Sequence, residues 1–132
     1  MNYLASNFTL GIIGGGQLGK MLCQVTSRLS INTNILDPSD DSPCKNLCSS
    51  FSVGNLMDFQ SVYEFGKQCD LVTYEIEHIN VDALEKLENE GIKVYPSSST
   101  LRIIQERTFK KNFLLKIIFQ LLITLITDHF PI

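Results

Sequence analysis

A glycine-rich turn near the start of the chain is the first feature whose residue types and spacing suggest chemistry. Gly14, Gly16 and Gly19 lie between an apolar run and a helical pattern, in the spacing Gly-x-Gly-x-x-Gly. The first glycine permits a tight turn, the second lets backbone amides approach an anion, and the third lets helix and strand pack closely. Free N–H groups and the helix dipole favour a phosphate there. The turn therefore predicts a phosphate-bearing ligand, unless the glycines serve only to make the turn.

An acidic residue follows the glycines at the distance that dinucleotide-binding folds use. In those folds an Asp or Glu about 20 positions further on binds the ribose hydroxyls. Asp37 stands at that distance, at the end of the second apolar run. An NAD-type ligand is therefore one interpretation of the turn, and other phosphate ligands remain open.

Two further carboxylates, Glu75 and Glu77, follow the fourth apolar run of the chain. Open α/β sheets bind ligands at the carboxyl ends of their strands, and strand alternation would direct both side chains to one side. Carboxylates there can accept hydrogen bonds from hydroxyl or amino groups. The alternative is a pair of solvated acids, which is the ordinary situation of exposed carboxylates.

The cysteines and histidines predict no metal site and no nucleophile. Cys44 and Cys48 have the spacing of half a metal site, but no second pair of ligands completes it. Neither histidine is spaced to activate a serine or a cysteine, so no catalytic triad is expected. Because no secretion signal is recognisable, we expect the four cysteines to be free thiols.

Alternating strands and helices must position these candidate residues. Apolar runs bounded by turn residues predict strands over residues 8–13, 33–36, 51–53, 71–74 and 93–95. Helical patterns separate most of them. This alternation predicts the α/β class, a Rossmann-like parallel sheet with right-handed crossovers and helices on both faces.

The helices are predicted from periodicity and from their end signals. The first carries apolar residues on one face of a 3.6-residue period, namely Leu18, Met21, Leu22, Val25 and Leu29. Asp58 and Asn80 are expected to cap the next two, and Gly91 to stop the third. A last helix is expected from Thr100, with Arg102 and Glu106 paired on its surface.

The length and net charge of the chain limit the functions that it can have. Its 132 residues predict one domain, and 11 Lys and Arg against 14 Asp and Glu give a net charge of -3. No basic stripe is present, so we expect no nucleic acid partner. The N-terminus does not resemble a signal peptide, and the uncharged run 117–127 is shorter than the roughly 20 residues that span a bilayer. A cytoplasmic protein without a membrane association is expected.

The amino-acid sequence around the glycines resembles that of a known family. Residues 11–22, Gly-Ile-Ile-Gly-Gly-Gly-Gln-Leu-Gly-Lys-Met-Leu, look like the opening of the ATPase subunits of phosphoribosylaminoimidazole carboxylase. This is the PurK, or 5-(carboxyamino)imidazole ribonucleotide synthase, family of the ATP-grasp superfamily. Further similar segments follow in the order of the family, namely 35–38, 69–79, 83–87, 94–97 and 101–107. The resemblance covers about residues 8–116.

The resemblance implies a fold, a reaction and a set of partners. Residues 1–116 would form the pre-ATP-grasp domain. The reaction of the family joins bicarbonate to the exocyclic amine of aminoimidazole ribonucleotide, using ATP and magnesium, in de novo purine biosynthesis. The implied partners are the ribonucleotide, ATP, bicarbonate and, for a full-length family member, a second copy in a homodimer.

The resemblance also implies roles for single residues. Gly16, Gln17, Leu18 and Glu75 would contact the ribonucleotide, and Arg107 would contribute to the ATP site. Catalytic residues and magnesium ligands would lie in the ATP-grasp domain, so none is expected in this chain.

The family pattern breaks after Lys116. Residues 117–132 form an apolar tail where the family continues into its ATP-grasp domain. We expect a truncation or a frameshift there, with a genuine extension of the last helix as the alternative, and no turnover by this chain alone. Two other functions stay open, an NAD(P)-binding domain of an oxidoreductase and a non-catalytic remnant that binds a phosphate ligand.

Overall fold

Short apolar and β-branched segments form the strands of the sheet, as their propensities favour. The computed structural model describes residues 7–129, with side-chain surroundings through residue 121. The described residues contain five strands: β1 (Thr9–Ile13), β2 (Asn32–Asp37), β3 (Ser50–Val53), β4 (Leu71–Tyr74) and β5 (Lys93–Tyr95). All neighbours pair in parallel, in the order β3-β2-β1-β4-β5. The predicted strands are confirmed to within one residue at each end, and so is the α/β class.

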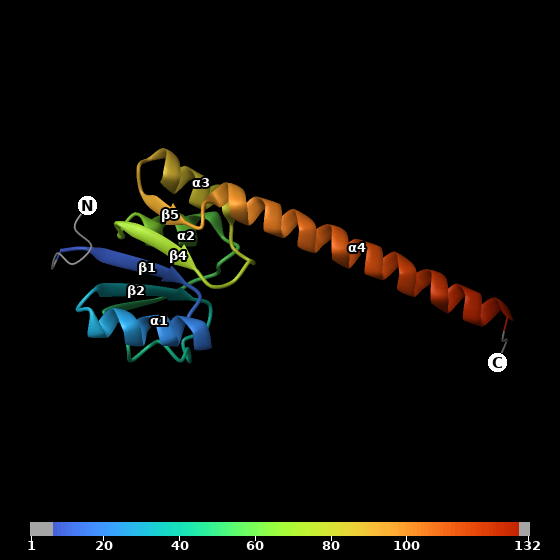
Figure 1. Ribbon diagram of the computed structural model, residues 1–132, viewed down its shortest axis with the longest axis horizontal. Helices are drawn as coiled ribbons and strands as arrows, with labels where there is room; N and C mark the ends of the chain where they lie inside the picture. Colours follow the sequence, from blue (N-terminus) through green and yellow to red (C-terminus); the bar gives the residue numbers. More distant parts are fainter. Residues whose placement is uncertain (1–6, 130–132) are drawn as a thin grey trace.

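Helices cover both faces of this sheet. They are α1 (Gln17–Arg28), α2 (Phe59–Gly66), α3 (Val81–Asn89) and α4 (Ser98–His129). Figure 1 shows α1 on one face, α2 and α3 on the other, and α4 extending far beyond the sheet. Strand alternation divides the core accordingly. Ile12 packs with Cys23 beneath α1, and Ile13 packs with Val62 and Leu84 beneath α2 and α3.

Helix α1 presents its apolar face away from the sheet. The five residues predicted to share one face are 39–60% exposed, whereas Gly19, Cys23 and Thr26 are buried. A Cβ atom on Gly19 would lie 2.6 Å from the carbonyl oxygen of Gly14, so only small side chains allow this close approach. The periodicity therefore predicts an amphipathic helix correctly, but the small residues, not the large apolar ones, face the sheet.

The ends of α2 and α3 are where the sequence places them. Asp58 accepts a hydrogen bond from the Ser61 N–H at 2.7 Å, and Asn80 accepts one from the Ala83 N–H at 3.0 Å. Gly91, just beyond α3, has a φ of 91°, which favours glycine. Both predicted caps and the predicted stop are confirmed.

Removing the Asn80 cap tests how strongly α3 depends on it. We expect Asn80→Ala to lower the free energy of unfolding by about 1 kcal/mol, because the helix loses its N-cap acceptor. The side chain also donates to the Met57 carbonyl at 3.0 Å. Urea denaturation of the variant and of Gln60→Ala, which loses only an exposed contact with Glu64, makes the comparison. Equal losses in both variants would contradict the cap's role.

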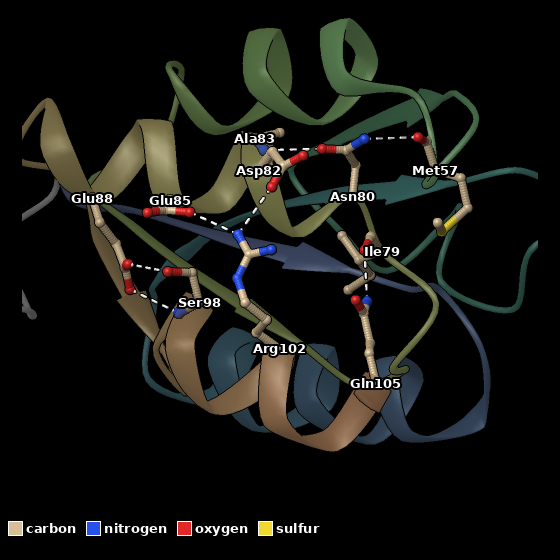
Figure 2. A network of polar contacts seen from close by, with 10 residues as sticks. All are labelled: Met57, Ile79, Asn80, Asp82, Ala83, Glu85, Glu88, Ser98, Arg102 and Gln105. Atoms are coloured by element: carbon tan, nitrogen blue, oxygen red, sulfur yellow. Dashed lines mark hydrogen bonds and ion pairs between the residues drawn. The ribbon is translucent and has the colours of Figure 1, made fainter. Parts of the chain in front are cut away.

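Helix α4 is anchored to α3 by its first two turns, and Figure 2 shows the contacts. The Glu88 carboxylate accepts hydrogen bonds from the N–H and the hydroxyl of Ser98, the first residue of α4. A residue of α3 therefore caps the N-terminus of α4. Arg102 donates to Asp82 at 2.9 Å and to Glu85 at 2.7 Å. The predicted pairing of Arg102 with Glu106 is wrong, because two carboxylates of α3 lie opposite the guanidinium.

Helix α4 starts at Ser98, two residues before the predicted Thr100, and runs without a break past Lys116 to His129. The predicted domain boundary after Lys116 lies inside this helix. A single helix can include both family-like residues and residues that no longer resemble the family, so the boundary stays a prediction. Residues 130–132 of the predicted tail lie outside the described residues, as do residues 1–6 at the other end. Among the described residues, no helix combines the length and apolar character needed to cross a membrane.

Candidate functional site

The glycine turn, Asp37 and Glu75 meet at one point on the carboxyl edge of the sheet. The glycine turn connects β1 to α1, and Glu75 directly follows β4, the neighbour of β1. Strand order reverses between β1 and β4, because β2 and β3 lie on the other side of β1. Ligands of open α/β sheets bind at such a switch point.

Glu75 occupies the glycine turn from the β4 side. Its Oε1 accepts a hydrogen bond from the Gly16 N–H at 2.8 Å, and its Oε2 accepts one from the Gly19 N–H at 3.3 Å. Gly14 has a φ of 102°, and a Cβ atom there would lie 2.6 Å from Cγ of Glu75. Helix α1 has no side-chain cap at its own N-cap residue, so Glu75 supplies both acceptors and negative charge.

A second carboxylate holds the turn from the β2 side. Oδ2 of Asp37 accepts from the Gly15 N–H at 2.7 Å, and Oδ1 accepts from the Ser39 N–H at 2.8 Å. The Ser42 hydroxyl donates to the Gly15 carbonyl at 2.6 Å. Asp37 thus lies beside the turn as predicted, but both its oxygens bind backbone N–H groups. Asp37 therefore joins the turn to the loop that follows β2.

The first turn of α1 keeps two backbone donors open. Among the described residues, no hydrogen bond uses the N–H of Gln17 or Leu18, and both side chains are exposed. These N–H groups lie next to Gly16, whose own N–H binds Glu75. The site therefore offers two donors and a fixed carboxylate within one turn of helix.

Two buried thiols pack behind the turn. Cys44 donates a weak hydrogen bond to the Gly16 carbonyl, with Sγ and O 3.8 Å apart. Burial raises the pKa of Cys23 to about 12 and also raises the pKa of Cys44. Both thiols therefore stay protonated at neutral pH, so they act as packing groups, not nucleophiles. All four cysteines are free, and no metal-binding group of three His, Cys, Asp or Glu occurs among the described residues.

The remaining predicted residues lie apart from the glycine turn. Arg107 is exposed on α4 and forms no ion pair with any described residue. Glu77 is exposed beyond β4, which ends at Tyr74, so strand alternation does not align it with Glu75. No hydrogen bond or ion pair in the described part of the chain joins Arg107 to Glu75.

Sequence reasoning missed two residues with contacts at the glycine turn or in the loop after β4. Ser42 lies in a polar, serine-rich loop that carries no signal for a contact with Gly15. Gln105 lies within the segment 101–107, whose resemblance to the family drew attention only to Arg107. Its amide donates to the Glu77 and Ile79 carbonyls at 2.7 and 2.8 Å, in the loop that Glu75 begins.

Comparison with known proteins identifies the family. Residues 8–105 match the family model described as the ribonucleotide synthetase preATP-grasp domain. The chain belongs to this family. The preATP-grasp assignment covers the sheet, the glycine turn and the first two turns of α4.

Relatives and solved structures give the same result. Phosphoribosylaminoimidazole carboxylase, chloroplastic, of Vigna aconitifolia is 44% identical over 106 residues, which are 80% of this chain and 19% of the relative. N5-carboxyaminoimidazole ribonucleotide synthetase of Thermotoga maritima has a TM-score of 0.73 and 40% identity, covering 83% of this chain and 30% of that one.

A third similar protein carries ligands. It is N5-carboxyaminoimidazole synthase of Aspergillus clavatus in complex with ADP and 5-aminoimidazole ribonucleotide, with a TM-score of 0.71 and 38% identity. The match covers 85% of this chain and 30% of that chain. The chain thus spans about a fifth to a third of the length of the relatives it matches.

Proposed function

We propose that this chain supplies the ribonucleotide-binding part of an ATP-dependent ligase. The reaction would join bicarbonate to aminoimidazole ribonucleotide in de novo purine biosynthesis, as the names of the relatives suggest. The observation that carries the proposal is the Glu75 carboxylate, which lies in the glycine turn beside the open N–H groups of Gln17 and Leu18. An NAD(P)-binding domain is disfavoured, because the Gly15, Gly16 and Gly19 N–H groups that would meet a pyrophosphate are bound by Asp37 and Glu75.

The ribonucleotide would contact Gly16, Gln17, Leu18 and Glu75. Because Glu75 and Asp37 already satisfy the N–H groups of Gly15, Gly16 and Gly19, a phosphate would not find these three amides free. The carboxylate oxygens of Glu75 retain lone pairs for further donors. We therefore assign Glu75 to the ribose hydroxyls or the exocyclic amine, and Gly14, Gly16 and Gly19 to shaping the turn. Open N–H groups in this turn come from Gln17 and Leu18.

ATP and magnesium would act largely beyond the described residues. Arg107 has a guanidinium without an ion pair among them, and its planar fork suits phosphate oxygens. ATP, when bound, supplies the energy for forming the new C–N bond. The described residues contain no cluster of acidic ligands for magnesium, so we place the magnesium ligands and the catalytic residues outside them.

A second copy of the protein is the further partner that we propose, as the resemblance to the family implies. Support comes from the outward face of α1, where five large apolar side chains are 39–60% exposed. Exposed apolar patches of this kind are typical of protein interfaces.

Calorimetric titration of the chain tests the proposed ligand. We expect saturable binding of aminoimidazole ribonucleotide and none of NAD, because the N–H groups of Gly15, Gly16 and Gly19 that would meet a pyrophosphate are bound by Asp37 and Glu75. Ribose 5-phosphate, which lacks the base and its amine, is the control for a general phosphate site. Binding of NAD alone would support the oxidoreductase alternative, and equal binding of ribose 5-phosphate would support the phosphate-binding remnant.

A further inference from the structure

The loop between β4 and α3, residues 75–80, carries the carboxylate on which the proposed site depends. Its two ends are anchored within the body of the domain. At the start, the Glu75 N–H donates to the Ile13 carbonyl at 3.2 Å, and the side chain lies in the glycine turn. At the end, the Asn80 N–H donates to the Leu56 carbonyl at 2.8 Å, and its side chain caps α3.

The middle of this loop is held by a side chain from α4. Nε2 of Gln105 donates to the Glu77 carbonyl at 2.7 Å and to the Ile79 carbonyl at 2.8 Å. Figure 2 shows the Gln105 amide reaching from α4 to Ile79. A carboxamide nitrogen has two hydrogens, so these two bonds use its full donor capacity. Among the described residues, no other side chain donates to these two carbonyls.

Two other polar side chains anchor α4 to α3 instead of to this loop. Ser98 binds Glu88, and Arg102 binds Asp82 and Glu85, all of them residues of α3. Gln105, one turn beyond Arg102, joins α4 to the segment carrying Glu75 through its two hydrogen bonds. Arg107 follows two residues later on the same helix.

We infer that Gln105 is a positioning residue for Glu75. By holding the Glu77 and Ile79 carbonyls, it fixes the path of the loop and keeps the Glu75 carboxylate on the Gly16 and Gly19 amides. It also ties the helix that carries Arg107 to the loop that carries Glu75. The consequence for ligand affinity rests on the proposed ribonucleotide site, whereas the effect on Glu75 does not.

Two α4 variants separate positioning from simple docking of the helix. Gln105→Leu keeps the size of the side chain but removes both donors, and Arg102→Met removes the anchor to α3 one turn earlier. Hydrogen exchange of the Gly16 and Gly19 amides, followed by NMR, reports the seating of Glu75 without any ligand. Titration with aminoimidazole ribonucleotide reports affinity, and thermal unfolding reports stability.

We expect Gln105→Leu to speed exchange of the Gly16 and Gly19 amides and to weaken ribonucleotide binding, each roughly five- to tenfold, as for one or two lost hydrogen bonds. Arg102→Met is expected to lower the melting temperature while leaving both site readouts unchanged. Gln105→Glu, which keeps the shape and removes the donors, repeats the test if the leucine variant does not fold.

Unchanged exchange at Gly16 and Gly19 in the Gln105 variants would overturn the inference, as would equal changes in Arg102→Met. A different result would contradict the proposed function. If the unmodified chain does not bind the ribonucleotide but the Gln105 variants still speed exchange of these two amides, the positioning of Glu75 stands and the proposed ligand is wrong.

Discussion

Replacing Glu75 by glutamine is expected to weaken binding of aminoimidazole ribonucleotide by at least about tenfold. The carboxylate bridges the Gly16 and Gly19 N–H groups, and an amide presents an NH2 group to one of them. A hydrogen bond to a charged group contributes roughly 1.5–3 kcal/mol, and a factor of ten corresponds to about 1.4 kcal/mol. The variant therefore loses both the seating of the side chain and the charge that meets the ligand. Calorimetric titration measures the change.

Glu77→Gln is the matched control for this result. Glu77 lies two residues further on, is exposed, and makes no side-chain hydrogen bond with a described residue. The same substitution there removes one negative charge without touching the glycine turn, so affinity should stay within about twofold. Equal losses in the two variants would show that only the local charge matters, and would contradict a direct role for Glu75.

Replacing Gly19 by alanine is expected to cause a large loss of stability. The added Cβ would lie 2.6 Å from the Gly14 carbonyl oxygen and 3.2 Å from Sγ of Cys44. The nearer atom belongs to the backbone of the turn, so α1 must move away from β1. Overpacking of this kind costs about 1–3 kcal/mol, or roughly 4–15 °C in melting temperature for a domain of this size. Thermal unfolding followed by circular dichroism measures the shift.

Gln24→Ala serves as the control on the same helix. Gln24 is exposed, and alanine there has a high helix propensity, so the melting temperature should change little. A stable Gly19→Ala variant would mean that α1 can shift without cost, and the third glycine would then have no packing role in the turn.

The strands, the helix caps and the glycine turn could be predicted because their signals are local. A strand of four to six residues shows its apolar run directly, and Asp58 and Asn80 cap residues only three positions away. The family resemblance added the importance of Glu75, which periodicity and spacing describe only as one of two acids. The ligand-binding roles of Gly16, Gln17, Leu18, Glu75 and Arg107 stay predictions.

Contacts between distant segments could not be predicted from the periodicity and spacing of the residues. Periodicity defined an apolar face on α1 but could not say which face the sheet would accept, because that depends on how closely Gly19 approaches Gly14. The sequence spacing of Arg102 and Glu106 suggested a pair on one helix. The docking of α4 on α3 instead placed Asp82 and Glu85 within reach of Arg102.

The sequence by itself determined the alternation of strands and helices, the turn between β1 and α1, and the family. These properties depend on residue types at short, fixed spacings. Only the tertiary structure decided what fills the turn. Glu75 is 59 residues from Gly16, and Asp37 is 22 residues from Gly15, and both reach the turn because parallel strands end at the same edge of the sheet. The amides that the motif offers to a phosphate are bound by carboxylates of the chain itself, because unpaired N–H groups at a helix start attract the nearest anion.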